Sequence, residues 1–290
     1  MKYSIVNEDK KEKKQDDSQF LAVEPKWNLD DIILSSSIKT SLKEVIAFCK
    51  KKEIILEKYN VKKFVKSDNL TIAINFFGVS GTGKSITAEA IAKELSSKII
   101  HVDYSQIEGM FHGETQKNLT KLFDKAEKEG FILFFDEADA VLGKRVANVT
   151  QATDHSINQA KSHLLNLLDR KNVVVIFATN FFENYDQAFF RRILFHIGFE
   201  LPNRDSRVQI WEYHLDKSIP KSTTYDWIAE ISEGLSGGDI KNIAFKLIIK
   251  LAVESIKELT NEVVQQEIEN YQLAKKMSLP TKQTIVFNDK

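Results

Sequence analysis

The chain has 290 residues, which is long enough for one large domain or two modest ones with a sizeable hydrophobic core. Its 41 lysines and arginines balance its 41 aspartates and glutamates, so the net charge gives no reason to expect nucleic acid or an anionic membrane as partner. The single cysteine excludes a disulfide framework, and with no apolar run near the ~18 residues of a membrane span and no signal-peptide core we expect a soluble cytoplasmic protein.

The first part of the chain is predicted to be a tail followed by a helix. Residues 1–24 are mostly polar and of mixed charge, with too little apolar surface to repay ordering, so we expect a flexible tail. After Trp27, in SIKTSLKEVIAFCKKKEIILEKY, apolar residues such as Leu42, Val45 and Ile46 recur at helical spacing. This spacing predicts an amphipathic helix.

Short apolar runs then alternate with helical stretches. The runs predicted as strands are TIAINFFG, KIIHVDY, FILFFDE, NVVVIFATN and LFHIGFEL, and residues 84–95, 114–129 and 157–169 are predicted as helices. Strands that are apolar on both faces and separated by helices fit a parallel sheet covered on both sides. We therefore predict an α/β domain over residues 25–202 with a parallel five-stranded sheet.

The composition changes after Pro202. The segments SRVQIWEYHL, TYDWIAEISEG and GGDIKNIAFKLIIKLAVESIKEL all have a helical period and no strand signal. They predict a smaller all-helical domain over residues 203–279, followed by a C-terminal tail over 280–290.

A glycine-rich stretch lies between the first predicted strand of the sheet and the helix after it. Gly78-Val-Ser-Gly-Thr-Gly-Lys-Ser85 matches the phosphate-binding pattern G-x-x-x-x-G-K-[ST] in the strand–helix context that this pattern requires. Glycines let backbone N–H groups turn toward phosphate oxygens, and the following helix adds its positive end. Lys84 would reach the terminal phosphates, and Ser85 would offer its hydroxyl to Mg²⁺. The alternative is an ordinary flexible turn.

A triphosphate site also needs an acid for its metal. Asp136 and Glu137 follow a fully apolar strand, so they are expected at the carboxyl edge of the sheet, where ligands bind in open α/β folds. Asp136 would position the metal, and Glu137 would polarise the attacking water. The alternative is an ordinary solvated strand end. Together with the glycine-rich loop, these carboxylates indicate an ATPase that uses ATP and Mg²⁺.

With these motifs in order, residues 27–275 resemble the AAA+ ATPases, specifically the central AAA group with proteasomal, segregase and katanin-like members. The resemblance implies a P-loop NTPase fold, with the helical domain acting as a lid. The stretch from Trp27 looks like the opening element that packs around adenine. The implied nucleotide contacts are Asp31, Ile32, Ile33, Gly78, Val79, Ser80, Gly81, Thr82, Gly83, Lys84, Ser85, Ile86, Asp136, His214, Gly237 and Gly238, with Ser85 and Asp136 also at the metal.

The resemblance also implies catalytic and substrate-gripping residues. Asn180, at the end of VVVIFATN, matches the sensor that hydrogen-bonds the attacking water. Arg191 and Arg192 look like arginine fingers that reach the nucleotide of a neighbouring subunit, where a fixed planar charge suits the developing phosphoryl charge. The set Phe111, His112 and Gly113 is similar to the pore loop, whose aromatic residue can grip an extended peptide.

A finger that acts on a neighbour implies a homo-oligomer, and the family assembles rings that are usually hexamers. We therefore expect ATP hydrolysis to remodel, unfold or disassemble a protein or peptide substrate in the pore, delivered directly or through an adaptor. One alternative is a remodeller of HORMA-type signalling proteins in bacterial defence. The other is a nucleic-acid-stimulated AAA+ motor, against which the balanced charge and the aromatic pore step count.

Overall fold

The computed structural model describes residues 20–63, 70–102, 115–143, 152–180, 185–253 and 255–278. The chain divides into two compact units, residues 1–200 and 201–290, which are described separately below. The predicted pore-loop residues 111–113, the C-terminal tail 280–290 and residues 1–19 of the predicted N-terminal tail lie outside the described residues.

The first unit is built on a six-stranded sheet with the order β1-β3-β4-β5-β2-β6. The five predicted strands are confirmed, and all are parallel to their neighbours among these five. They are β2 (Ile72–Gly78), β3 (Ile99–Val102), β4 (Ile132–Phe135), β5 (Val174–Thr179) and β6 (Phe195–Phe199).

A sixth strand, β1 (Ala22–Val23), extends the sheet, although the sequence analysis assigned residues 1–24 to a tail. It pairs antiparallel with β3, and the nearby Phe20 side chain is buried in the core. A strand of two residues is too short to show the alternation that marks a strand in a sequence. Its position depends on the free edge of β3, which the sequence does not reveal.

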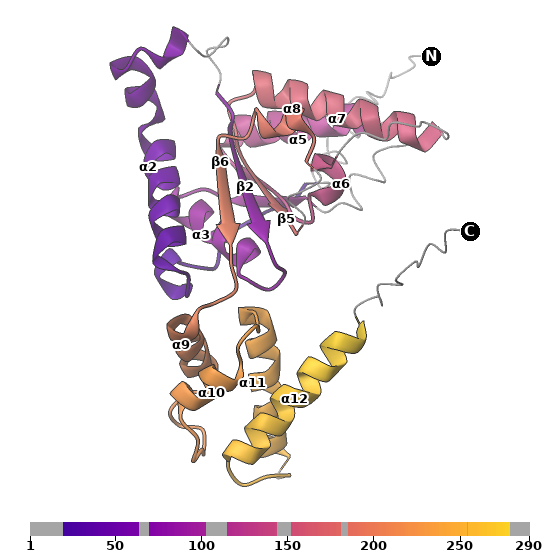
Figure 1. Ribbon diagram of the computed structural model, residues 1–290. Helices are drawn as coiled ribbons and strands as arrows, with labels where there is room; N and C mark the ends of the chain where they lie inside the picture. Colours follow the sequence, from indigo (N-terminus) through magenta and orange to yellow (C-terminus); the bar gives the residue numbers. More distant parts are fainter. Residues whose placement is uncertain are drawn as a thin grey trace, which may run out of the picture. The chain divides into compact units, whose positions relative to one another are not determined.

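Helices cover both faces of this sheet (Figure 1). On one face lie α2 (Ser36–Lys58) and α3 (Lys84–Glu94), and on the other lie α5 (Thr115–Glu129), α6 (Asp139–Leu142), α7 (Ala152–Arg170) and α8 (Gln187–Phe190). Successive strand residues face opposite layers: Phe134 packs in the layer of α2, and Phe135 in that of α7. Two cores therefore hold β4 and β5, which explains why these strands read as continuous apolar runs.

The second unit contains α9 (Arg204–His214), α10 (Tyr225–Ile231), α11 (Gly237–Ala252) and α12 (Asn261–Ser278). At its centre Trp211 is fully buried and donates from Nε1 to Ser232 Oγ at 2.9 Å. The buried Arg207 guanidinium donates to the Ala229 and Pro202 carbonyl oxygens, both at 2.9 Å. These contacts join α9 to the end of α10 and give the unit a core of its own.

The predicted helical segment from Gly237 ends earlier than its period suggests. α11 stops at Ala252, and α12 begins only at Asn261. Between them Leu259 is fully buried, its N–H donates to Pro220 O at 2.9 Å, and its carbonyl accepts from Ser222 N at 3.1 Å. A tertiary pairing with the 220–222 segment therefore competes with the helix, and periodicity alone cannot show this.

Candidate active site

The loop between β2 and α3 depends on glycines. Gly78, Gly81 and Gly83 have φ angles of 136°, 77° and 99°, which residues with a side chain rarely adopt. A Cβ added at Gly78 would lie 2.1 Å from the Phe199 carbonyl oxygen at the end of β6. The loop can therefore follow this path against β6 only because Gly78 has no side chain.

Lys84, the first residue of α3, is almost completely buried beneath this loop. Its ammonium donates to Gly78 O at 2.7 Å, to Val79 O at 3.0 Å and to Asn180 Oδ1 at 2.9 Å. Burial lowers the pKa of Lys84, and the nearby Asp136 carboxylate opposes this shift. The three donors of the ammonium thus have three acceptors, and one of these is the predicted sensor.

Ser85, the second residue of α3, meets Asp136, which directly follows β4. Ser85 Oγ donates to Asp136 Oδ2 at 2.8 Å, and the other carboxylate oxygen, Oδ1, accepts from Glu137 N at 2.9 Å. A hydroxyl and a carboxylate held together suit Mg²⁺, which takes one or two protein oxygens and completes its octahedron with phosphate and water. The chemistry of these two residues fits the metal role that the sequence predicted for them.

Glu137 has an unusual backbone. Its φ of 49° lies in the left-handed region, although it is not a glycine, and its side chain is exposed. The next residue, Ala138, donates from its N–H to Ala178 O at 2.8 Å, which ties this turn to β5. Such a strained residue at a strand end persists only where the surroundings impose it, and it marks a candidate functional position.

Asp139 is a site residue that the sequence analysis missed. Its carboxylate accepts a short hydrogen bond from Thr179 Oγ1 and a longer one of 3.5 Å from Asn180 N. Asp139 therefore fixes the end of β5, from which Asn180 extends to Lys84. The available signal was the third acidic residue of FFDEAD, which follows the two predicted acids by three and two residues.

The two predicted finger arginines differ. Arg192 forms a double hydrogen bond with Asp169 of α7, from Nε to Oδ1 and from Nη2 to Oδ2, both at 2.8 Å. Its Nη1 also donates to Ala188 O at 3.0 Å. The Arg191 backbone N–H donates to Gln187 O at 3.2 Å, but its side chain is exposed and makes no hydrogen bond or ion pair to any residue within the described ranges.

The predicted adenine element forms a short 3₁₀ helix, η2 (Leu29–Asp31), capped by Asn28. The Asp31 carboxylate accepts from Asn28 Nδ2 at 2.5 Å, so it serves the cap, and the Ile32 side chain is buried. Next to this element, Lys26 N donates to Glu89 Oε2 of α3 at 3.1 Å. The segment therefore runs beside the helix that follows the phosphate loop.

The predicted lid residues belong to the second unit and are described within it. Gly237 and Gly238 are the first two residues of α11, after the cap Ser236, which forms a capping box with Asp239. Burial lowers the pKa of His214 at the end of α9, and Lys241 adds to this effect. Within this unit, residues 237 and 238 thus occupy the helix start that the sequence indicated.

Comparisons with known proteins give a family match and a much longer relative. The family described as "ATPase family associated with various cellular activities (AAA)" matches residues 74–201. The chain is also 32% identical over 247 residues to a Plasmodium falciparum (isolate 3D7) protein named as a cell division cycle ATPase. That alignment covers 83% of this chain but 19% of the relative, so the chain spans about a fifth of the relative's length.

The glycine loop, the buried lysine and the mostly parallel sheet define an α/β P-loop NTPase. Residues 74–201 of this unit match the AAA ATPase family, so the part of the chain that carries the glycine loop is an AAA ATPase domain. Among the described residues, no helix is long and apolar enough to cross a bilayer.

Proposed function

We propose that this AAA ATPase works as a ring of identical subunits that uses ATP hydrolysis to remodel a protein substrate. The observation that carries the proposal is the convergence of Lys84, Ser85, Asp136 and Asn180 at one edge of the sheet, together with an exposed Arg191 elsewhere on the same unit. One half of a hydrolysis site is thus assembled within the chain. The finger that completes it comes from a neighbouring chain.

Each residue has a role in this proposal. Lys84 and the loop amides bind the phosphates, and Ser85 and Asp136 hold Mg²⁺, which neutralises phosphate charge. Glu137 accepts a proton from the attacking water as its oxygen bonds to the γ-phosphorus and the bond from that phosphorus to the β,γ-bridging oxygen of ADP breaks. Asn180 orients that water. A phosphate oxygen also competes with Asn180 Oδ1 for Lys84, so the sensor and the phosphate site are linked by a contact that is already present.

The protein substrate is proposed from the predicted pore loop and from the net charge. In the sequence, the predicted pore-loop residues 111–113 come shortly before α5, and the net charge of zero offers no broad attraction to nucleic acid. We propose a hexameric ring in which the Phe111 side chain grips the substrate. The capture experiment below identifies the substrate, such as a HORMA-type signalling protein, together with any adaptor that delivers it.

The test uses a pair of variants of the full chain. Glu137→Gln keeps the size of the side chain but removes the proton acceptor, so it is expected to bind ATP, assemble and retain substrate with turnover reduced by about 10²-fold or more. Lys84→Ala serves as the matched control because it loses the phosphate contact. Protein that is retained by Glu137→Gln only with ATP, is absent from Lys84→Ala and stimulates wild-type hydrolysis would support the proposal.

Two outcomes would contradict it. One is a wild-type chain that stays monomeric with ATP and whose specific activity does not change with its concentration. The other is hydrolysis that rises with single-stranded DNA or RNA while Glu137→Gln retains no protein above the Lys84→Ala background. The second result would favour the nucleic-acid motor instead.

A further inference from the structure

The two adjacent arginines at the end of α8 have different surroundings, although the sequence treats them as equivalent. Arg192 uses both edges of its guanidinium, one on the Asp169 carboxylate and one on the Ala188 carbonyl. Arg191 has none of these partners and is exposed. Successive side chains on a helical turn point about 100° apart. Because Arg192 is hydrogen-bonded to Asp169 of α7, the Arg191 side chain points away from α7.

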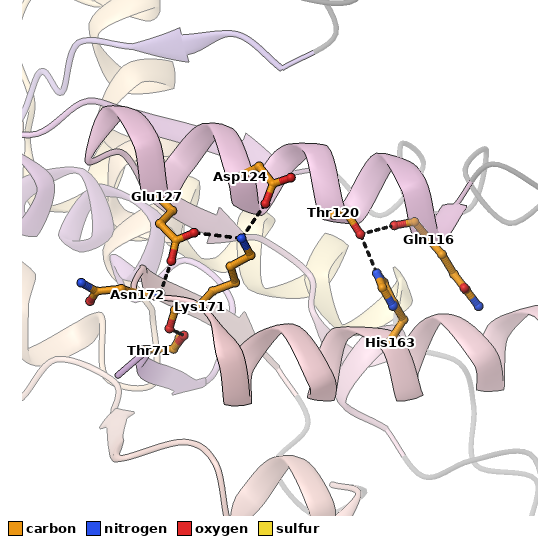
Figure 2. Close-up of polar contacts among 8 residues, drawn as sticks. All are labelled: Thr71, Gln116, Thr120, Asp124, Glu127, His163, Lys171 and Asn172. Carbon is orange, nitrogen blue, oxygen red and sulfur yellow. Dashed lines mark hydrogen bonds and ion pairs between the residues drawn. The ribbon is translucent and has the colours of Figure 1, made fainter. Parts of the chain in front are cut away.

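The carboxylate that holds Arg192 is itself on a fixed element. Two residues after Asp169, Lys171 donates to Asp124 Oδ1 at 2.6 Å and to Glu127 Oε2 at 2.8 Å, both on α5. Figure 2 shows this network together with the contact from Thr120 Oγ1 to His163 Nε2, which joins the middle of α7 to α5. These contacts attach α5 to the middle of α7 and to the residue that follows its end.

Further hydrogen bonds strengthen this attachment. Glu127 Oε1 accepts from Asn172 N at 2.7 Å, and Thr71 Oγ1, at the start of β2, donates to Lys171 O at 2.5 Å. Burial disfavours the charge on Glu127, but the hydrogen bonds from Lys171 and Asn172 outweigh it, so the pKa of Glu127 lies below its ordinary value. The anchor for Asp169 is thus an ionised, hydrogen-bonded network connected to the sheet.

The start of α8 is fixed as well. Asp186 caps it by accepting from Ala188 N at 2.8 Å, and Asp186 N donates to Leu142 O at the end of α6, also at 2.8 Å. After the arginines, Leu194 N donates to Ala73 O of β2 at 3.0 Å. The short arginine-bearing segment is therefore held at its start, at its end and, through Arg192, in between.

We propose that Arg192 is not a finger but a positioning residue, which with Asp169 forms a clamp that orients Arg191, the member of this pair that is presented to a neighbouring subunit. This inference rests on the proposed action of an arginine on a neighbour's nucleotide. A bidentate arginine–carboxylate pair has defined geometry in addition to its attraction, which suits it to fixing a direction. Removing either partner frees the turn in the same way.

The test compares four variants of the full chain: Arg191→Ala, Arg192→Ala, Asp169→Ala and the double variant Asp169→Ala/Arg192→Ala. A clamp predicts that Asp169→Ala and Arg192→Ala each lower kcat about tenfold, that the double variant is no worse than either, and that ATP affinity stays within about twofold. Arg191→Ala should lose more turnover than any of them. The control is Arg204→Ala, which removes an arginine paired with Asp226 and Glu230 in the second unit and should keep wild-type turnover.

Three results would overturn the clamp. If Asp169→Ala keeps full turnover while Arg192→Ala loses it, Arg192 acts directly as a finger. If both keep full turnover, the pair is an ordinary surface contact. If Arg191→Ala keeps full turnover, Arg191 is not the residue presented.

A charge exchange and hydrogen exchange complete the test. Asp169→Arg/Arg192→Asp should recover turnover relative to the single charge-reversed chains, since a clamp needs a pair and a finger needs a guanidinium at 192. Amide hydrogen exchange over residues 187–193 should rise about tenfold in Asp169→Ala and Arg192→Ala, and unchanged protection would refute the clamp. Hydrogen exchange needs no ATP turnover. A wild-type chain without ATPase activity would therefore refute the proposed function, while the exchange rates would still show whether the clamp exists.

Discussion

At the scale of single residues, the candidate phosphate site depends on positive φ angles, which residues with a side chain rarely adopt. Gly78, Gly81 and Gly83 meet this requirement without a side chain, whereas Glu137 adopts a left-handed conformation with one. Glu137 is the predicted proton acceptor, and its strained backbone places it next to Asp136. Stability and chemistry should therefore respond in opposite directions to substitution at this position.

The first prediction concerns Glu137→Gly and Glu137→Ala. Both remove the carboxylate, so turnover should fall about 10²-fold or more in each. Glycine accepts the φ of 49° without strain and alanine does not, so the glycine variant should unfold with a free energy about 1 kcal/mol greater than that of the alanine variant. Urea unfolding of both chains measures the difference. Equal stabilities would show that the left-handed backbone carries no strain.

The second prediction concerns Asp139, which holds Thr179 and Asn180 in place. Asp139→Ala removes an acceptor of both groups, so the sensor should lose its orientation, with kcat falling about tenfold and ATP affinity changing less than about threefold. Asp139→Asn keeps one acceptor oxygen, so its kcat should lie between those of the wild type and Asp139→Ala. A loss of affinity as large as the loss of kcat would indicate that Asp139 supports the phosphate loop and not the sensor.

At the scale of elements, the turn from α8 into β6 places a histidine beneath the arginine-bearing segment. His196 lies opposite Asn75 of β2, and its ring stacks on Phe190 with centroids 4.5 Å apart. Burial lowers the pKa of His196 more than the carbonyl groups of Phe190 and Ile193 raise it. The folded protein therefore resists protonation at this position.

The third prediction follows from that shift. The unfolded chain takes up the proton near pH 6.5, whereas the folded chain does so only at lower pH. The unfolded state then binds more protons as the pH falls from about 7 to about 5, so the free energy of unfolding should decrease over this window. His196→Phe keeps an aromatic ring but has no group that binds a proton, so its free energy of unfolding should decrease less over this window than that of the wild type.

Thermal unfolding at several pH values measures the effect. His214→Phe is the matched control in the second unit, where burial also lowers a histidine pKa. The His214 variant should retain the contribution of His196 to unfolding of the first unit. An identical pH slope in wild type and His196→Phe would show that His196 does not contribute.

At the scale of the whole molecule, each of the two units has its own buried core. The sheet core lies between layers of helices in residues 20–200, and Trp211 is the largest fully buried side chain, at the centre of the helical unit. Two cores imply that damage to one should not unfold the other. The proposed roles of the glycine loop in the first unit and of the helices in the second can then be tested separately by mutation.

The fourth prediction uses this separation. Trp211→Ala removes the largest core side chain and the hydrogen bond to Ser232, at a cost of about 3–5 kcal/mol to the helical unit. Limited proteolysis should then cut within residues 201–278 while a fragment near residues 20–200 survives and still binds a fluorescent ATP analogue. One cooperative loss of the entire chain would show that the units do not unfold separately.

Much of this organisation can be predicted from the residues alone, because it depends on local patterns. The five parallel strands follow from apolar runs, and the phosphate loop from glycines with a lysine and a serine at set spacing. The pairing of Ser85 with Asp136 could be expected because both follow strands of one parallel sheet. The assignments of lid and pore residues to nucleotide and substrate stay predictions.

The sequence by itself determined the class of the protein, since backbone freedom, apolar periodicity and the order of motifs are properties of neighbouring residues. Only the tertiary structure decided that Asp139 supports Asn180, that β1 joins the edge of β3 and that Arg192 faces Asp169 while Arg191 does not. Each of these depends on which residue meets a partner that is tens of residues away in the sequence. In the sequence the two adjacent arginines cannot be told apart. In the structure they differ, because Asp169 of α7 lies within reach of Arg192 only.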